Sequence, residues 1–107
     1  MNQSRLEQLF EFLKEDPDDP FNWYALATEY LKKDPKEALK YYEKLLTDYE
    51  NYVPTYYHAA KVYAALGEHE QAEHTFRKGI QVSLQQGNRK AQQELQNAYN
   101  EWKDEME

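Results

Sequence analysis

The chain has 107 residues, a formal net charge of −7 at pH 7 and no cysteine. This length fits one domain, the acidic balance disfavours nonspecific binding to nucleic acid, which needs a cationic surface, and the lack of cysteine excludes disulfides and thiolate metal sites. No apolar stretch is long enough for a membrane span or a signal peptide, so we expect a cytoplasmic protein without membrane contact.

The first predicted helix covers residues 3–15. Its apolar residues fall on one stripe with helical spacing and are Leu6, Leu9, Phe10, Phe12 and Leu13. The segment Asp16-Pro17-Asp18-Asp19-Pro20 ends this helix, because proline disfavours helical backbone at the residue before it.

The second predicted helix runs from Pro20 to Lys32. Asp19 stands at its N-cap position and Pro20 at its first position, where the missing N–H has no helical partner to lose. The pair Asp34-Pro35 repeats this start signal for a third helix, with Glu37 placed as in a capping box.

A fourth helix is predicted from Pro54 to Leu66, with Gly67 as its left-handed C-cap. A fifth begins near Glu70, and a sixth covers residues 89–105. Residues at core spacing on the last two helices are Ala72, Phe76, Gly79, Ile80 and Leu84, then Ala91, Leu95, Ala98 and Trp102. Runs of Val, Ile and Thr are rare, so the sequence predicts an all-α fold with six helices and no strand.

Large and small residues recur in the same order on two pairs of helices. The first member of each pair carries Trp23, Leu26, Ala27 and Tyr30, then Tyr56, Ala59, Ala60 and Tyr63, 33 positions on from Trp23 to Tyr56. The second member carries Ala38, Tyr42 and Leu45, then Ala72, Phe76 and Gly79, 34 positions on from Ala38 to Ala72. These are the residues expected to pack the repeats together, with large rings against alanine-sized gaps.

This pattern resembles the tetratricopeptide repeat, a helix–turn–helix unit of about 34 residues. The resemblance implies a short right-handed α-solenoid of stacked antiparallel helix hairpins, organised as a single domain over residues 1–107. Its parts are an N-terminal half-repeat (1–16), repeat one (20–50), repeat two (53–86) and a C-terminal capping helix (88–107). Pro17 stands where a preceding unit would place its closing proline, whereas Glu50 replaces that proline after repeat one and Tyr56 replaces the first tryptophan of repeat two.

No arrangement of residues indicates catalysis or a bound ion. His69 and His74 are five apart, which does not place them on one helix face. Asp16, Asp18 and Asp19 lack the glycine turn and the distal glutamate of a calcium loop, and helix capping explains them. We therefore expect a protein that is not an enzyme and binds no metal or cofactor.

The resemblance also implies a concave groove, lined by the first helix of each repeat, that binds a protein or peptide segment. The side chains that it places there are Phe21, Tyr24, Thr28 and Leu31, with Tyr57, Lys61, Ala64 and Ala65. Tyr24, Thr28 and His58 occupy places where some members clamp a C-terminal carboxylate, so we do not expect that mode of binding.

Two alternatives stay open. Tyr24 and Tyr57 could serve only to pack helices against each other. The chain could instead be a self-assembly module, with leftover apolar surface at Phe10, Phe12 or Trp102 driving formation of a homodimer.

Overall fold

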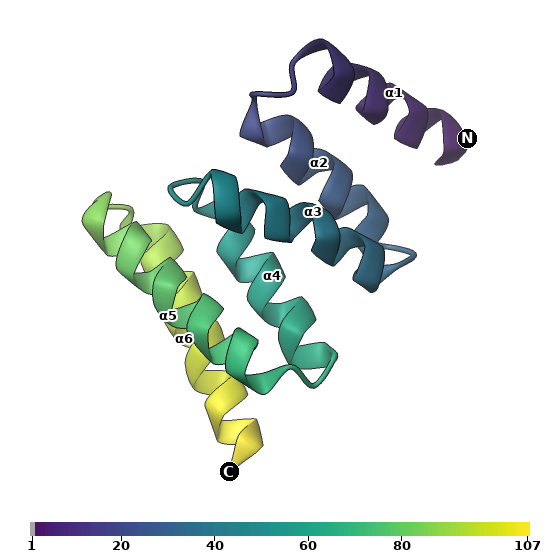
Figure 1. The fold of residues 1–107 in the computed structure, drawn as a ribbon. Helices are drawn as coiled ribbons and strands as arrows, with labels where there is room; N and C mark the ends of the chain where they lie inside the picture. The colour runs from purple at the N-terminus through teal and green to yellow at the C-terminus, as the bar shows by residue number, and fades with distance from the viewer. Residues whose placement is uncertain (1) are drawn as a thin grey trace. The chain divides into compact units, whose positions relative to one another are not determined.

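The computed structural model describes the backbone of residues 2–107 and the side chains from Arg5 onward. Within residues 2–107 the chain forms six α-helices and no strand (Figure 1). The helices are α1 (Asn2–Glu15), α2 (Pro20–Leu31), α3 (Pro35–Asp48), α4 (Pro54–Ala65), α5 (His69–Gln85) and α6 (Arg89–Met106). The predicted all-α class and the order of the helices are confirmed. Contacts group the helices into two compact units, of which the first ends at Tyr52 and the second is Val53–Glu107.

Helix starts follow the predicted capping signals. An Asp19 carboxylate oxygen accepts a hydrogen bond from the Phe21 N–H at 3.0 Å, and Asp34 Oδ1 accepts one from the Glu37 N–H at 3.2 Å. These bonds satisfy backbone donors that the first helical turn leaves free. After α4, Gly67 has a φ of +78°, a left-handed conformation that residues with a side chain rarely adopt.

In the first unit, α2 packs on α3 and α1 packs on α2. The buried residues between α2 and α3 are Leu26, Ala27, Ala38, Tyr42 and Leu45. Trp23 is only partly buried, because it lies at the edge of this pair, with its ring centroid 6.2 Å from that of Tyr41. Its indole N–H donates to the Pro17 carbonyl at 2.8 Å, so Trp23 also links α2 to the turn that follows α1.

The apolar stripe of α1 is narrower than the sequence predicts. Leu9 is buried, whereas Phe10 and Phe12 are exposed. On a helix these two phenylalanines project from opposite flanks, and α2 covers the side that carries Leu9. Phe10 still packs edge-on against Tyr30, with ring centroids 6.4 Å apart.

In the second unit, α4 packs on α5, and α6 packs on both. The predicted packing residues of α4 and α5 are all buried, namely Tyr56, Ala59, Ala60, Tyr63, Ala72, Phe76 and Gly79. α6 contributes Leu95, which is buried, and Trp102, whose ring centroid lies 5.8 Å from that of Phe76.

Two expectations about apolar residues in this unit are wrong. Trp102 is not leftover surface, because it is half-buried against the rings of Phe76 and Tyr99. Leu84 is not part of the core, since it lies in the last turn of α5 with 61% of its surface exposed. None of the helices in the described part of the chain has the length and apolar character needed to cross a membrane.

Candidate protein-binding site

The predicted binding face of the first unit lies on α2. Phe21, in the first turn, is 56% exposed and makes no ring contact with another aromatic side chain among the described residues. Leu31, in the last turn, is half-buried. Phe21 is thus a large apolar side chain left open at one end of α2.

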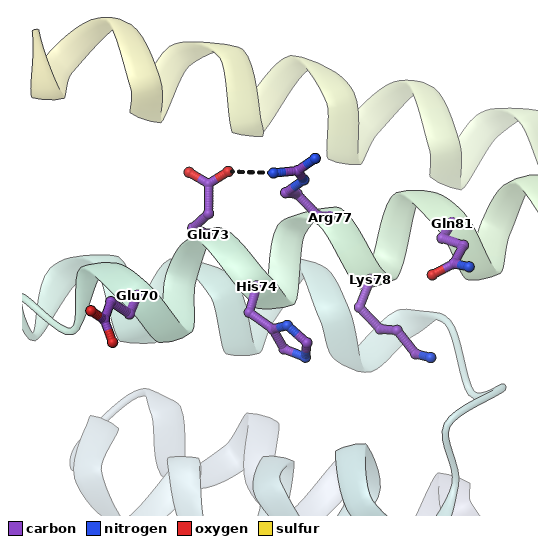
Figure 2. A pocket seen from close by; sticks show the side chains of 6 residues that line it. All are labelled: Glu70, Glu73, His74, Arg77, Lys78 and Gln81. Carbon is purple, nitrogen blue, oxygen red and sulfur yellow. Dashed lines mark ion pairs between the residues drawn. The ribbon is translucent and has the colours of Figure 1, made fainter.

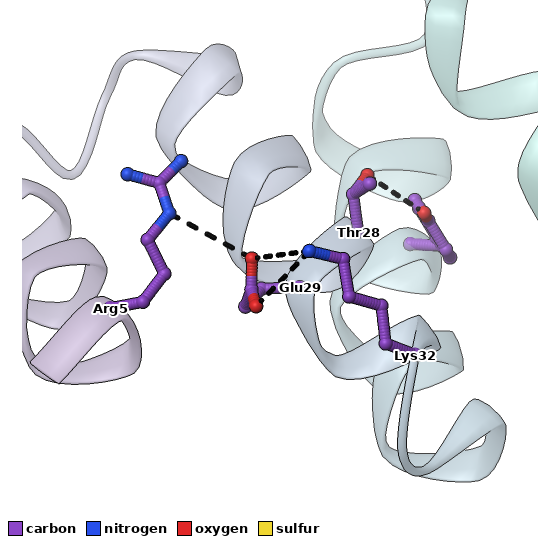
Figure 3. Close-up of polar contacts among 5 residues, drawn as sticks. Arg5, Thr28, Glu29 and Lys32 are labelled. Carbon is purple, nitrogen blue, oxygen red and sulfur yellow. Dashed lines mark hydrogen bonds and ion pairs between the residues drawn. The ribbon is translucent and has the colours of Figure 1, made fainter. Parts of the chain in front are cut away.

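Tyr24 and Thr28, in the middle of the same face, also take part in packing. The Tyr24 ring centroid lies 5.7 Å from that of Tyr52 and 6.4 Å from that of Tyr42. Thr28 Oγ1 lies 3.0 Å from the Tyr42 hydroxyl, a hydrogen bond drawn in Figure 3. Burial raises the pKa of Tyr42 to about 12 and raises the pKa of Tyr24 above its ordinary value. Both hydroxyls are therefore neutral at physiological pH.

The corresponding face of the second unit lies on α4 and centres on Tyr57, which is 36% exposed. The Lys61 ammonium lies 5.5 Å from the centre of its ring, within cation–π range. The His58 ring meets that of Tyr57 edge-on at 5.7 Å. Burial, and then the Lys61 charge, lower the pKa of His58, so this imidazole is neutral at pH 7. Ala64 is half-buried and Ala65 is exposed.

An ionic cluster that the sequence analysis did not predict joins α1 to α2. Arg5 Nε lies 3.8 Å from a Glu29 carboxylate oxygen, and Lys32 Nζ lies 3.3 Å from the same oxygen (Figure 3). The i,i+3 spacing of Glu29 and Lys32 indicates one of these pairs, but nothing local in the sequence indicates the pair with Arg5. Exposed pairs of this kind contribute only about 0–1 kcal/mol to stability.

A shallow polar hollow runs along α5. Figure 2 shows its lining side chains, which are Glu70, Glu73, His74, Arg77, Lys78 and Gln81. Glu73 pairs with Arg77 at 3.6 Å and also accepts a hydrogen bond from the Tyr99 hydroxyl of α6. Across the described residues no group of three or more His, Asp or Glu side chains could hold a metal ion. The mixed charges along α5 do not form a recognisable catalytic arrangement.

Comparison with known proteins places the chain among helical repeat proteins. Residues 29–99 match the family model described as tetratricopeptide repeat. No curated protein matches the sequence.

Two solved structures, both of a tetratricopeptide repeat domain protein from Salinibacter ruber, are similar to the chain. The crystal structure has a TM-score of 0.76 at 40% identity, with 79% of this chain and 97% of that chain covered. The solution NMR structure has a TM-score of 0.76 at 42% identity, with 81% of this chain and 89% of that chain covered. Proteins with this fold are generally non-catalytic scaffolds that mediate protein–protein interactions. The chain belongs to the tetratricopeptide repeat family.

Proposed function

We propose that the chain is an adaptor that binds an extended or helical segment of another protein, and that α2 of the first unit and α4 of the second unit each present a binding face. The face on α2 comprises Phe21, Tyr24, Thr28 and Leu31, and the face on α4 comprises Tyr57, Lys61, Ala64 and Ala65. Such a mixture of aromatic rings, small residues and one cation suits a peptide with apolar anchors and a nearby acidic group.

The observation that carries the proposal is the exposure of Phe21 and Tyr57. Each lies on the predicted binding face of its own unit, and each leaves a third or more of its surface open. Tyr24, by contrast, is half-buried against Tyr42 and Tyr52, so it offers a partner only part of its ring. Aromatic residues are enriched at protein interfaces, and Tyr is among the residues that most often carry the binding energy.

The test is capture of partner proteins from a cell lysate with the tagged chain, followed by titration of the captured partner as a purified protein. The double variant Phe21→Ser with Tyr57→Ser should weaken the partner's affinity by at least about tenfold, since it removes two aromatic anchors. Both side chains are exposed, so the variant is expected to keep its far-ultraviolet circular dichroism spectrum.

Leu84→Ser is the matched control, because Leu84 is more exposed than either aromatic residue and lies on neither binding face. It should leave the affinity unchanged. Unchanged binding by the double variant, or equal weakening by the control, would show that α2 and α4 do not bind the partner.

Self-assembly is the second candidate function, and the exposure of Phe10 and Phe12 favours it. Light scattering of the purified chain at dilute and at high micromolar concentration separates the two functions. A monomer at every concentration rules out self-assembly and leaves the adaptor function as it stands.

A further inference from the structure

Two tyrosine rings of the first unit lie against each other between α2 and α3, the helices that pack side by side in Figure 1. Tyr30 belongs to α2 and Tyr41 to α3. Their ring centroids are 5.5 Å apart and their planes are inclined by only 6°, so the two rings are stacked. Both side chains are partly buried and partly open to solvent. The fold therefore holds the pair together and still leaves it accessible to a small dissolved reagent.

The hydroxyl groups of the two rings also meet. Burial raises the pKa of Tyr41 above its ordinary value, and the neighbouring Tyr30 and Glu37 raise it further, in part through a hydrogen bond with Tyr30. In a tyrosine ring the reactive ortho carbons adjoin the carbon that carries the hydroxyl. Stacked rings whose hydroxyls share a hydrogen bond therefore bring an ortho carbon of one ring close to an ortho carbon of the other.

Other tyrosine contacts of the same unit have a different geometry. The Tyr24 ring lies 5.7 Å from that of Tyr52 at an inclination of 63°, and 6.4 Å from that of Tyr42 at 58°. In these inclined contacts the edge of one ring is turned toward the face of the other, so the ortho carbons of the two rings do not lie side by side. Proximity alone does not give these contacts the arrangement of Tyr30 and Tyr41.

The neighbours of the pair favour oxidation of the two tyrosines. Trp23 is itself easily oxidised, and its ring centroid lies 6.2 Å from that of Tyr41, so it can pass an oxidation on to Tyr41. Phe10, 6.4 Å from Tyr30, has no oxidisable hydroxyl. The sequence contains no cysteine, the side chain that most readily returns an electron and a proton to an oxidised tyrosine. An oxidation that reaches this row of rings therefore stays on its tyrosines and tryptophan until they react.

We propose that Tyr30 and Tyr41 form an intramolecular dityrosine cross-link when the chain meets hydrogen peroxide and a haem peroxidase. The peroxidase removes one electron from each ring, and each hydroxyl releases its proton. One carbon–carbon bond then forms between the two ortho carbons, and the protons of the two broken C–H bonds move to the oxygens and restore both phenols. Two electrons and two protons leave in total, and they reduce one hydrogen peroxide to two molecules of water.

The cross-link has a consequence for the first unit. It joins α2 covalently to α3 across the turn 32–34, and it restricts the unfolded chain as a disulfide does. The oxidised chain should therefore have a more stable first hairpin. Neither tyrosine belongs to the proposed binding faces, so this modification site is separate from the adaptor function.

The test oxidises the purified chain at high dilution and isolates the monomer by size exclusion, because dilution favours bonds within a chain over bonds between chains. The monomer should show the blue fluorescence of dityrosine. Trypsin should then release the peptide 15–32, which contains Tyr30, joined to the peptide 41–44, which contains Tyr41. The joined peptides should be lighter by two hydrogen atoms than their sum, and fragmentation in the mass spectrometer locates the bond.

Variants show which hydroxyls the reaction needs. Tyr30→Phe and Tyr41→Phe each keep a ring and remove its hydroxyl, so each should abolish the joined peptides while the far-ultraviolet circular dichroism spectrum stays the same. Tyr52→Phe is the matched control, because it removes a hydroxyl from the inclined contact with Tyr24, and it should leave the yield unchanged. The cross-linked monomer should unfold at a higher urea concentration than the untreated chain, whereas oxidised Tyr41→Phe should show no such shift.

Other outcomes overturn the proposal. These are dityrosine in dimers alone, a main product linked through Tyr24 or Tyr42, or an unchanged yield in Tyr30→Phe. Oxidation of the chain unfolded in urea is the last comparison, because the rings are then no longer stacked. If the bond between Tyr30 and Tyr41 makes up the same share of all dityrosine products in urea, the fold does not direct the reaction.

Discussion

Gly79 shows how tightly single residues of the second unit are packed. A Cβ atom placed on Gly79 would lie 2.5 Å from Tyr56 Cβ and 3.1 Å from Leu95 Cδ1. Gly79→Ala gains about 1 kcal/mol of helix propensity, but forcing α4 and α6 away costs about 1–3 kcal/mol. We expect the unfolding free energy in urea to fall by about 1 kcal/mol. Gln81→Ala, on the exposed face of α5, is the control and should change it by less than about 0.5 kcal/mol.

Ionisation of the Tyr42 hydroxyl makes the unfolding free energy depend on pH in the alkaline range. Its pKa is about 12 in the folded chain because the hydroxyl is buried, against about 10 in the unfolded chain. Between these values the unfolded chain loses the proton and the folded chain keeps it. Its contribution is therefore fully present below pH 10 and is lost as the pH rises to 12. We expect Tyr42 to account for about 2–3 kcal/mol of the fall in unfolding free energy between pH 10 and pH 12. Urea denaturation at each pH measures this fall.

Tyr42→Phe is the variant that isolates this effect. It should make the decline between pH 10 and 12 shallower, while costing about 1 kcal/mol at pH 7 through the lost hydrogen bond to Thr28. An unchanged decline would mean that other tyrosines dominate the alkaline transition.

At the scale of elements, Asn22 links α1 to α2. Its side-chain amide donates to the Phe12 carbonyl at 3.3 Å and to the Asp16 carbonyl at 3.0 Å, both near the C-terminal end of α1. The Phe12 carbonyl also accepts from the Asp16 N–H at 3.0 Å, and the Asp16 carbonyl accepts from the Asp19 N–H at 3.4 Å. The Asn22 amide therefore adds a second hydrogen bond to each carbonyl and holds the end of α1 against the first turn of α2. We expect Asn22→Ala to speed hydrogen exchange in α1 by about fivefold or more, since each lost bond is worth about 1 kcal/mol.

Asn22→Asp sharpens this test. A carboxylate accepts hydrogen bonds but cannot donate to the two carbonyls. It should loosen α1 at least as much as alanine does, while exchange in α5 and α6 stays unchanged. Faster exchange in all helices would point to general destabilisation instead.

The sequence predicts the helix starts well, because capping chemistry is local. Asp19 and Asp34 bond to amides two and three residues away, so their roles follow from spacing alone. How deeply a side chain is buried depends, by contrast, on the residues of other elements that pack against it. Helical periodicity places Tyr24 on the binding face, but it does not reveal that the ring of Tyr52, from the turn after α3, covers part of it.

The candidate site is therefore less predictable than the fold. Leu9 is 4% exposed and Phe12 is 50% exposed, and only the structure reveals this difference. Hydrophobicity alone assigns Leu9 and Phe12 to the same core stripe.

At the scale of the whole molecule, α6 completes the second unit. Leu95 is buried, and Tyr99 and Trp102 cover Phe76 of α5. We expect Leu95→Ala to lower the stability of this unit by about 2–5 kcal/mol, the usual cost of a cavity in a core. Hydrogen exchange should show the loss in α4, α5 and α6, with less change in α1 to α3. An equal loss in all six helices would show that the two units unfold as one.

The outward side of α6 has a bearing on how the protein behaves in different solvents. Gln93 bonds to Asn97 and Gln96 bonds to Asn100, both at 3.0 Å, so two pairs of amides lie outside the face of the helix that carries the buried Leu95. Amides neither titrate nor respond strongly to ionic strength, unlike carboxylates, which lose their charge in acid. This hydrated surface should therefore still oppose aggregation in mildly acidic or concentrated salt solutions. A surface kept soluble by charge repulsion alone would begin to self-associate under the same conditions.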